Sequence, residues 1–125
     1  MTGRVRVVER AAGNQKNYWT EYGGREYQSK AEALRAQELD LLKRAGEVMD
    51  WGRQVKFSCD IDGRHICNYY ADFVVTWADG RVTVEDVKGR KSGPQYQLFR
   101  LKKKLVEALH NVKIQEVNMS RKRRV

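Results

Sequence analysis

The spacing of hydrophobic and polar positions changes several times along the chain, and each change predicts a different element. Residues 1–17 mix arginine, glycine, asparagine and glutamine with little periodicity, which is typical of a flexible basic arm. Two aromatic-rich runs follow at 18–22 and 25–27, and they flank Gly23-Gly24. This arrangement favours a β-hairpin, because tight two-residue turns are rich in glycine.

A helix is expected from Ser29 to Ala45. Ser29 and Glu32 have the spacing of a capping box, and Gly46 suits the position just beyond a helix. Glu38 falls near the middle of the apolar face, an unusual place for a carboxylate. The residues of that face, which recur at a 3.6-residue period, are Leu34, Leu41, Leu42 and Ala45.

Alternation with a period of two then predicts three strands joined by tight turns. Apolar residues alternate with polar ones in 55–59, and further strand-like runs occupy 66–77 and 82–87. Asp-Gly dipeptides at 62–63 and 79–80 separate these runs, and such dipeptides favour hairpin turns. The three strands should therefore form an antiparallel meander.

The last part of the chain predicts a second helix, a final strand and a tail. Pro94 suits the first turn of a helix, which should run to about His110 and be followed by a strand at 112–117. Residues 121–125 form a basic tail. The apolar contacts of this helix are expected to be Tyr96, Phe99, Leu101, Leu105 and Leu109.

The predicted order of elements indicates the fold class. A hairpin followed by α, β, β, β, α and β elements favours an α/β (α+β) fold, with a mixed central sheet flanked by helices. The chain has 125 residues, which fits one domain. That domain is expected at 18–120, between the arm and the tail, and no internal repeat divides it.

Charge narrows the class of partner. Lysine and arginine number 25 against 16 acidic residues, a formal net charge of +9. A compact domain with this excess attracts polyanions, of which nucleic acid is the commonest, and a basic protein that is merely soluble is the alternative.

With no signal peptide and no apolar run that could span a membrane, we expect a cytoplasmic protein without a membrane partner, in which Cys59 and Cys67 stay reduced.

The feature with the clearest chemistry is Asp72, followed fourteen residues later by Asp86-Val87-Lys88. The turn at 79–80 makes the two strands neighbours, and residues two apart in a strand share a face, so Asp86 and Lys88 should point the same way beside Asp72. Two carboxylates on adjacent strands suit Mg²⁺, with Mn²⁺ as a substitute. Such a cation polarises a phosphodiester, and a lysine beside it stabilises developing negative charge.

Structural explanations compete with this chemistry. A cross-strand ion pair between Asp72 and Lys88 would account for both residues without a metal. Glu85 alternates to the face opposite Asp86, where a solvated strand acid is expected. Cys59, His65 and Cys67 do not have the spacing of a zinc site.

Three stretches taken together resemble the signature of PD-(D/E)XK nucleases: Ser29-Lys30-Ala31-Glu32, Ala71-Asp72-Phe73 and Glu85-Asp86-Val87-Lys88-Gly89. Over residues 18–117 the chain is also similar to a phage-encoded endonuclease-like family long described as of unknown function. The stretches that carry this second resemblance are 29–33, 41–48, 85–89 and 99–105. Ala71 stands where the superfamily has the proline of its name.

The resemblance implies a restriction-endonuclease-like αβββαβ core and a role for each matching residue. Asp72 and Asp86 would be metal ligands, and Lys88 would be the catalytic lysine. Glu32 would be the helix acid that completes the metal shell, directly or through water. Periodicity gives Glu38 the better helix face and capping explains Glu32, but the resemblance favours Glu32.

Polar and basic residues near this motif are expected to bind nucleic acid, although solvated surface positions are the alternative for Gln95 and Lys102. The expected contacts are Arg90, Lys91, Gln95, Arg100, Lys102 and Lys103.

These observations predict a Mg²⁺-dependent endodeoxyribonuclease. Small relatives in the superfamily often act as dimers and several cut branched DNA. The resemblance therefore favours a homodimer that acts on branched or Holliday-junction DNA in phage recombination or replication, in the cytoplasm of a bacterial host. The alternative is a non-catalytic nucleic-acid-binding module that retains the fold.

Overall fold

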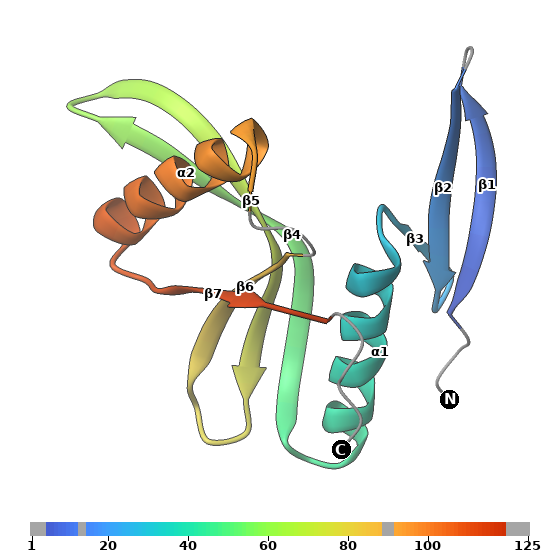
Figure 1. Ribbon diagram of the computed structural model, residues 1–125. Coiled ribbons are helices and arrows are strands. Elements are labelled where there is room, and N and C mark those ends of the chain that lie inside the picture. The colour runs from blue at the N-terminus through green and yellow to red at the C-terminus, as the bar shows by residue number, and fades with distance from the viewer. Residues whose placement is uncertain (1–4, 13–14, 89–91, 120–125) are drawn as a thin grey trace.

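The structure is a computed structural model that describes residues 5–12, 15–88 and 92–119 (Figure 1). In chain order its elements are β1 (Arg6–Ala12), β2 (Gln15–Tyr22), β3 (Arg25–Tyr27), α1 (Lys30–Arg44), β4 (Val48–Ile61), β5 (Arg64–Trp77), β6 (Val82–Val87), α2 (Pro94–His110) and β7 (Ile114–Val117). Neither helix in this part of the chain is long and apolar enough to cross a membrane.

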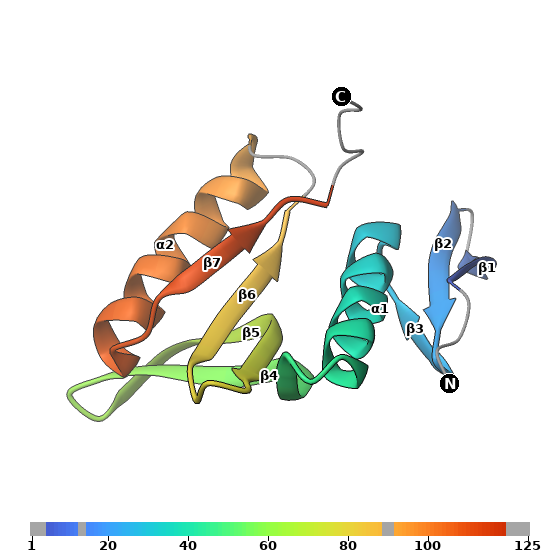
Figure 2. The same ribbon diagram turned by 90° about the horizontal axis from the view of Figure 1, so that it is seen from below.

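The strands form two sheets. β1, β2 and β3 make an antiparallel three-stranded sheet, and β4, β5, β6 and β7 lie in that order in the central sheet. β4, β5 and β6 pair antiparallel, whereas β7 pairs parallel to β6. Figure 2 shows α1 and α2 on opposite sides of β6 and β7. This is the mixed α+β arrangement expected from the order of elements, and it is consistent with a restriction-endonuclease-like core.

Local signals produce the ends and turns of these elements. The Ser29 hydroxyl accepts a hydrogen bond of 3.1 Å from the backbone N–H of Glu32, so Ser29 is the N-cap of α1 as expected. Asp62 and Gly63 both have positive φ, 50° and 79°, as a tight turn between twisted strands requires. Pro94 opens α2, where its missing N–H costs no hydrogen bond.

Two apolar clusters hold the helices against the strands. On one side, α1 buries its small face against Phe73 and Val75 of β5 and against Tyr22 and Tyr27 of the first sheet. On the other side, Phe99 and Val106 of α2 pack with residues of β4 to β7. The members of this second cluster are Cys59, Tyr69, Ala71, Val84, Phe99, Val106 and Ile114.

The buried faces of both helices differ from the expected ones. α1 buries Ala33, Ala36 and Leu39, whereas Leu41 is 51% exposed. The two alanines let the helix backbone approach the sheet closely, and this sets a rotation that the leucine pattern did not reveal. In α2, Leu101 is likewise exposed, while Phe99 and Val106 supply the buried contacts.

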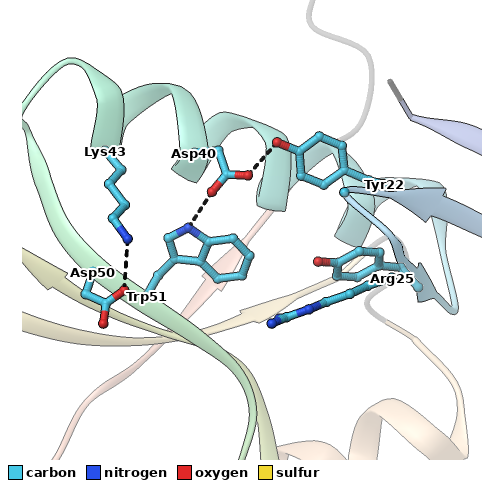
Figure 3. A pocket seen from close by; sticks show the side chains of 8 residues that line it. Tyr22, Arg25, Asp40, Lys43, Asp50 and Trp51 are labelled. Atoms are coloured by element: carbon cyan, nitrogen blue, oxygen red, sulfur yellow. Dashed lines mark hydrogen bonds and ion pairs between the residues drawn. The ribbon is translucent and has the colours of Figure 1, made fainter. Parts of the chain in front are cut away.

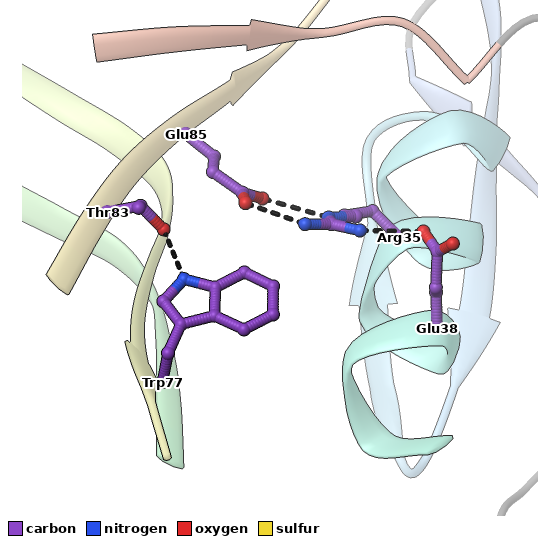
Figure 4. A network of polar contacts seen from close by, with 5 residues as sticks. All are labelled: Arg35, Glu38, Trp77, Thr83 and Glu85. Carbon is purple, nitrogen blue, oxygen red and sulfur yellow. Dashed lines mark hydrogen bonds and ion pairs between the residues drawn. The ribbon is translucent and has the colours of Figure 1, made fainter. Parts of the chain in front are cut away.

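Glu85 is a second correction. It was expected to be solvated, but only 1% of it is exposed. Arg35 of α1 reaches it across the core, with Nε donating to Oε1 at 2.9 Å and Nη2 donating to Oε2 at 2.6 Å. The same guanidinium holds Glu38 at 2.7 Å (Figure 4). Burying a carboxylate without such a partner would be strongly unfavourable, because the charge would lose its hydration. The charged hydrogen bonds from Arg35 therefore account for the burial of Glu85.

The N-terminal segment also differs from the expectation of an arm without regular structure. β1 pairs along its whole length with β2, from Arg6 opposite Glu21 to Ala12 opposite Gln15. Backbone hydrogen bonds make such a ladder, and they need no hydrophobic alternation in the sequence. The predicted tail at 121–125 lies outside the described residues.

Candidate active site

Asp72 and Asp86 lie side by side at the point where β5 and β6 diverge. The ladder between these strands pairs Val74 with Val84 and Phe73 with Glu85, and the next step of the same register places Asp72 opposite Asp86. There the Asp72 carboxylate accepts a hydrogen bond of 2.8 Å from the backbone N–H of Val87. This contact fixes the carboxylate beside the chain that carries Asp86 and Lys88.

Lys88 is held over the same acids by three contacts. Its Nζ lies 2.8 Å from Oδ2 of Asp86 and 3.7 Å from the centre of the Phe99 ring. Its backbone N–H donates to the carbonyl of Val117 at 2.9 Å. The ion pair that Lys88 forms is therefore with Asp86 of the preceding strand, and not the cross-strand pair with Asp72 that was the structural alternative. Because Asp86 is 4% exposed, the ammonium group is its main compensating charge.

Glu32 approaches these residues from the first turn of α1 and lines the same cavity. Burial raises the pKa of its carboxyl group; the charge of Arg53 lowers that pKa, and the charge of Asp86 raises it. Glu38, the other candidate helix acid, is half exposed and pairs with Arg35. The structure therefore brings Glu32, and not Glu38, to Asp72 and Asp86.

The electrostatics of Asp72 reflect its burial beside two other acids. Burial, followed by the charges of Asp86 and Glu32, raises the pKa of Asp72 from 3.8 to about 8. The hydrogen bond from Val87 opposes this shift but does not cancel it. The raised pKa means that Asp72 holds a proton more readily than a free carboxylate does, and a divalent cation could take the place of that proton.

This shift predicts a pH-dependent stability in the absence of metal. The folded chain keeps on Asp72 a proton that the unfolded chain releases above about 3.8, so the stabilisation by that proton is lost as pH rises through about 8. We expect Asp72→Asn, which cannot ionise, to raise the free energy of unfolding by about 1–3 kcal/mol more at pH 9 than at pH 5, measured by urea denaturation in EDTA. The exposed acid Asp62 gives the control Asp62→Asn, and equal effects of Asp72→Asn at both pH values would contradict the expectation.

The cavity that these acids line has a volume of about 370 Å³. Gln95 and Lys102 of α2 also line it, as expected for substrate contacts, whereas Arg100 and Lys103 do not. Lys103 instead pairs with Glu116 of β7 at 3.1 Å. Arg90 and Lys91 lie outside the described residues. The complete lining is Glu32, Asn68, Tyr69, Tyr70, Asp72, Asp86, Val87, Lys88, Gln95, Leu98, Phe99 and Lys102.

Sequence reasoning missed two residues near the acids. The hydroxyl of Tyr69 is buried beside the cavity, and burial together with the charges of Asp86 and Asp72 raises its pKa. Arg53 lies 4.1 Å from the centre of the Tyr27 ring and donates to the carbonyl of Glu26, within electrostatic reach of Glu32. The Tyr69-Tyr70 pair just before Asp72 is a sequence signal that could have pointed to Tyr69. Arg53 has no comparable signal.

A second cavity, of about 300 Å³, lies between α1, β4 and the first sheet (Figure 3). One of the two acids that line it, Asp40, accepts hydrogen bonds from the Tyr22 hydroxyl at 2.5 Å and from Trp51 Nε1 at 2.9 Å. Both carboxylate oxygens of Asp40 are thus used to join the hairpin to β4. The hydrogen bonds of this cavity hold two parts of the fold together, and its lining does not bring three acids together as the first cavity does.

The acid cavity fits a hard divalent cation that keeps part of its water shell. Among the residues that the structure describes, no three His, Cys, Asp or Glu side chains form a ready-made cage for a metal. Mg²⁺ does not need one, because it is commonly held by one or two carboxylates together with water and substrate oxygens. Asp72 and Asp86 supply such a pair, and Glu32 lies close enough to act on Asp72 electrostatically.

The fold and this cavity define the chain as a mixed α+β protein with buried acids and a lysine at the divergence of two strands. One family model, described as "Protein of unknown function (DUF1064)", matches residues 15–124, so the chain belongs to the DUF1064 family. No curated protein and no solved structure matches the chain. The family description names no reaction, substrate or cofactor.

Proposed function

We propose that the protein is a metal-dependent endonuclease of the PD-(D/E)XK type that hydrolyses phosphodiester bonds in DNA. The observation that carries the proposal is the convergence of Glu32, Asp72, Asp86 and Lys88 on one cavity. The raised pKa of Asp72 supports it, because acids in this state are stabilised by a bound cation. The net charge of +9 suits a polyanionic substrate.

Each residue has a role in this mechanism. Asp72 and Asp86 would hold Mg²⁺, or Mn²⁺ in its place, with Glu32 acting directly or through water; a bound cation would polarise the scissile phosphodiester. Lys88 orients the attacking water and stabilises the negative charge that develops on the phosphate, while Asp86 and Phe99 hold its ammonium group in place. The oxygen of the water bonds to phosphorus as the bond to the leaving oxygen breaks; the water gives up a proton to solvent, and the leaving oxygen takes one up from solvent.

The substrate is bound beside these groups through its phosphates. Gln95 and Lys102, at the cavity wall, would contact the strand being cut. The resemblance to nucleases that cut branched DNA supports a branched or Holliday-junction substrate, with a homodimer in the cytoplasm of a bacterial host as the working form.

Cleavage assays with Lys88→Met test the proposal. Supercoiled plasmid, single-stranded DNA and a four-way junction are incubated with Mg²⁺ or Mn²⁺. We expect wild-type protein to cut at least one of them, EDTA to abolish cutting, and Lys88→Met to slow it about a hundredfold, because charge stabilisation at the phosphate is lost. Lys113 is exposed before β7, so Lys113→Met is a matched control that should cut at the wild-type rate. Tight binding without cleavage of any substrate would indicate a non-catalytic binding module instead.

A further inference from the structure

Two neighbouring tyrosines of β5 have opposite environments. The ring of Tyr69 is buried and packs against Phe57 and Phe99. Tyr70 also lines the acid cavity, but it is 51% exposed. Leu98 of α2 lines the same cavity and is 53% exposed. The core explains Tyr69, whereas Tyr70 and Leu98 together place exposed apolar surface on the lining of a cavity that also holds the acids.

The position of Tyr70 relates it to the proposed reaction centre. Tyr70 and Asp72 line the same cavity and are two residues apart on β5, a separation of about 7 Å along the strand. This separation is of the order of one nucleotide along an extended strand. A phosphate held at Asp72 would therefore place the base of an adjoining nucleotide near the Tyr70 ring.

Two lysines lie on elements next to Tyr70. Lys56 of β4 is the direct cross-strand partner of Tyr70, and it is exposed. Lys102 of α2 lines the cavity, and its Nζ donates to the Asn68 carbonyl at 3.3 Å. An aromatic platform flanked by lysines is the combination that holds single-stranded nucleic acid, because the ring stacks on a base and the cations contact the phosphates.

A fully paired duplex cannot use this platform. The faces of its bases are covered by their neighbours, so an aromatic ring reaches a base face only where a nucleotide has left the stack. We propose that Tyr70, supported by Leu98, stacks on an unpaired base beside the scissile phosphate, and that the substrate of this site is DNA with an unstacked nucleotide, such as a fork or a single strand. This inference rests on the proposed nuclease function and adds the recognition of the base.

Binding measurements test the inference separately from cleavage. Fluorescence anisotropy in Ca²⁺ compares a fully paired hairpin with a fork of the same length and charge, and a series of forks carries one abasic nucleotide at successive unpaired positions. We expect wild-type protein to bind the fork about tenfold more tightly than the hairpin, and Tyr70→Ala to lose about tenfold on the fork alone. Tyr70→Phe, which keeps the ring, should bind like wild type. Ile66→Ala is the matched control, because Ile66 is 52% exposed on the same strand but does not line the cavity.

The abasic series identifies the base that is contacted. At one position, removal of the base should weaken binding by wild-type protein, so that wild type and Tyr70→Ala have the same affinity for that fork. The inference is overturned if Tyr70→Ala, shown to be folded by its thermal transition, binds every DNA within twofold of wild type or loses equally on fork and hairpin. It is also overturned if Tyr70→Ala alters only the oligomeric state. Wild-type cleavage in Mg²⁺, assayed in parallel, reports on the nuclease function itself, so fork preference without cleavage contradicts that function and not the stacking.

Discussion

Asp86→Asn is expected to slow Mg²⁺-dependent DNA cleavage by at least about a thousandfold, with DNA affinity kept within a few fold of wild type. Asp86 is the most buried of the three cavity acids, and it touches the proposed cation site and the Lys88 ammonium group at once. Its replacement by an amide removes the charge that would hold the cation and releases Lys88 from its partner. Rates of plasmid nicking at saturating protein measure the effect, and filter binding measures the affinity.

The control for this substitution should show that any loss comes from the site. Asp62→Asn makes the same chemical change at an exposed turn residue, where the left-handed backbone tolerates asparagine well. It should cleave at the wild-type rate. If Asp86→Asn retains more than about a tenth of wild-type activity, Asp86 is not a metal ligand of this reaction.

Among the variants proposed, Arg35→Met is expected to lose the most stability, about 3–5 kcal/mol in the free energy of unfolding measured with urea. The guanidinium of Arg35 makes two hydrogen bonds to Glu85, and its removal would leave that carboxylate buried without a partner. Methionine keeps much of the length and apolar stem of arginine, so the change tests the charge more than the packing.

Two further variants separate the buried pair from its exposed extension. Glu38→Gln should cost less than about 1 kcal/mol, because Glu38 is half exposed and its attraction to Arg35 is screened by water. The double variant Arg35→Met/Glu85→Leu should recover most of the loss caused by Arg35→Met, since no isolated charge remains in the core. A loss for Arg35→Met of under about 1 kcal/mol, or no recovery in the double variant, would show that the pair is not what holds α1 to β6.

Elements that depend on neighbouring residues were predictable from the sequence. The hairpin around Gly23-Gly24, the cap at Ser29 and the start of α2 at Pro94 appear where they were expected. Each depends on contacts within a few positions, such as the 3.1 Å bond from the Glu32 N–H to Ser29. The proximity of Asp72 and Asp86 followed from the alternation of two strands joined by a short turn.

The choice among the acids of the chain was not predictable in this way. Three glutamates have different environments, although they are the same residue type. Glu32 lines the cavity, Glu38 is half exposed and Glu85 is buried. The partner that settles the burial of Glu85 is 50 positions away, on a helix whose rotation depends on where two alanines meet the sheet. The predicted apolar face did not reveal that rotation, because it included Leu41, which is 51% exposed, and left out Leu39, which is fully buried.

From the hairpin around Gly23-Gly24 onward, the sequence by itself determined the order of the elements, the turns that join them and the pair of acidic positions on adjacent strands. These follow from backbone preferences and alternation over short distances. Only the tertiary structure decided that Glu32 is the helix acid that joins this pair and that Lys88 contacts both Asp86 and the ring of Phe99. It also decided that Tyr70 is half exposed on the cavity lining, whereas the neighbouring Tyr69 is buried. These outcomes depend on how the helices pack on a twisted sheet, and packing brings together residues that no local pattern connects.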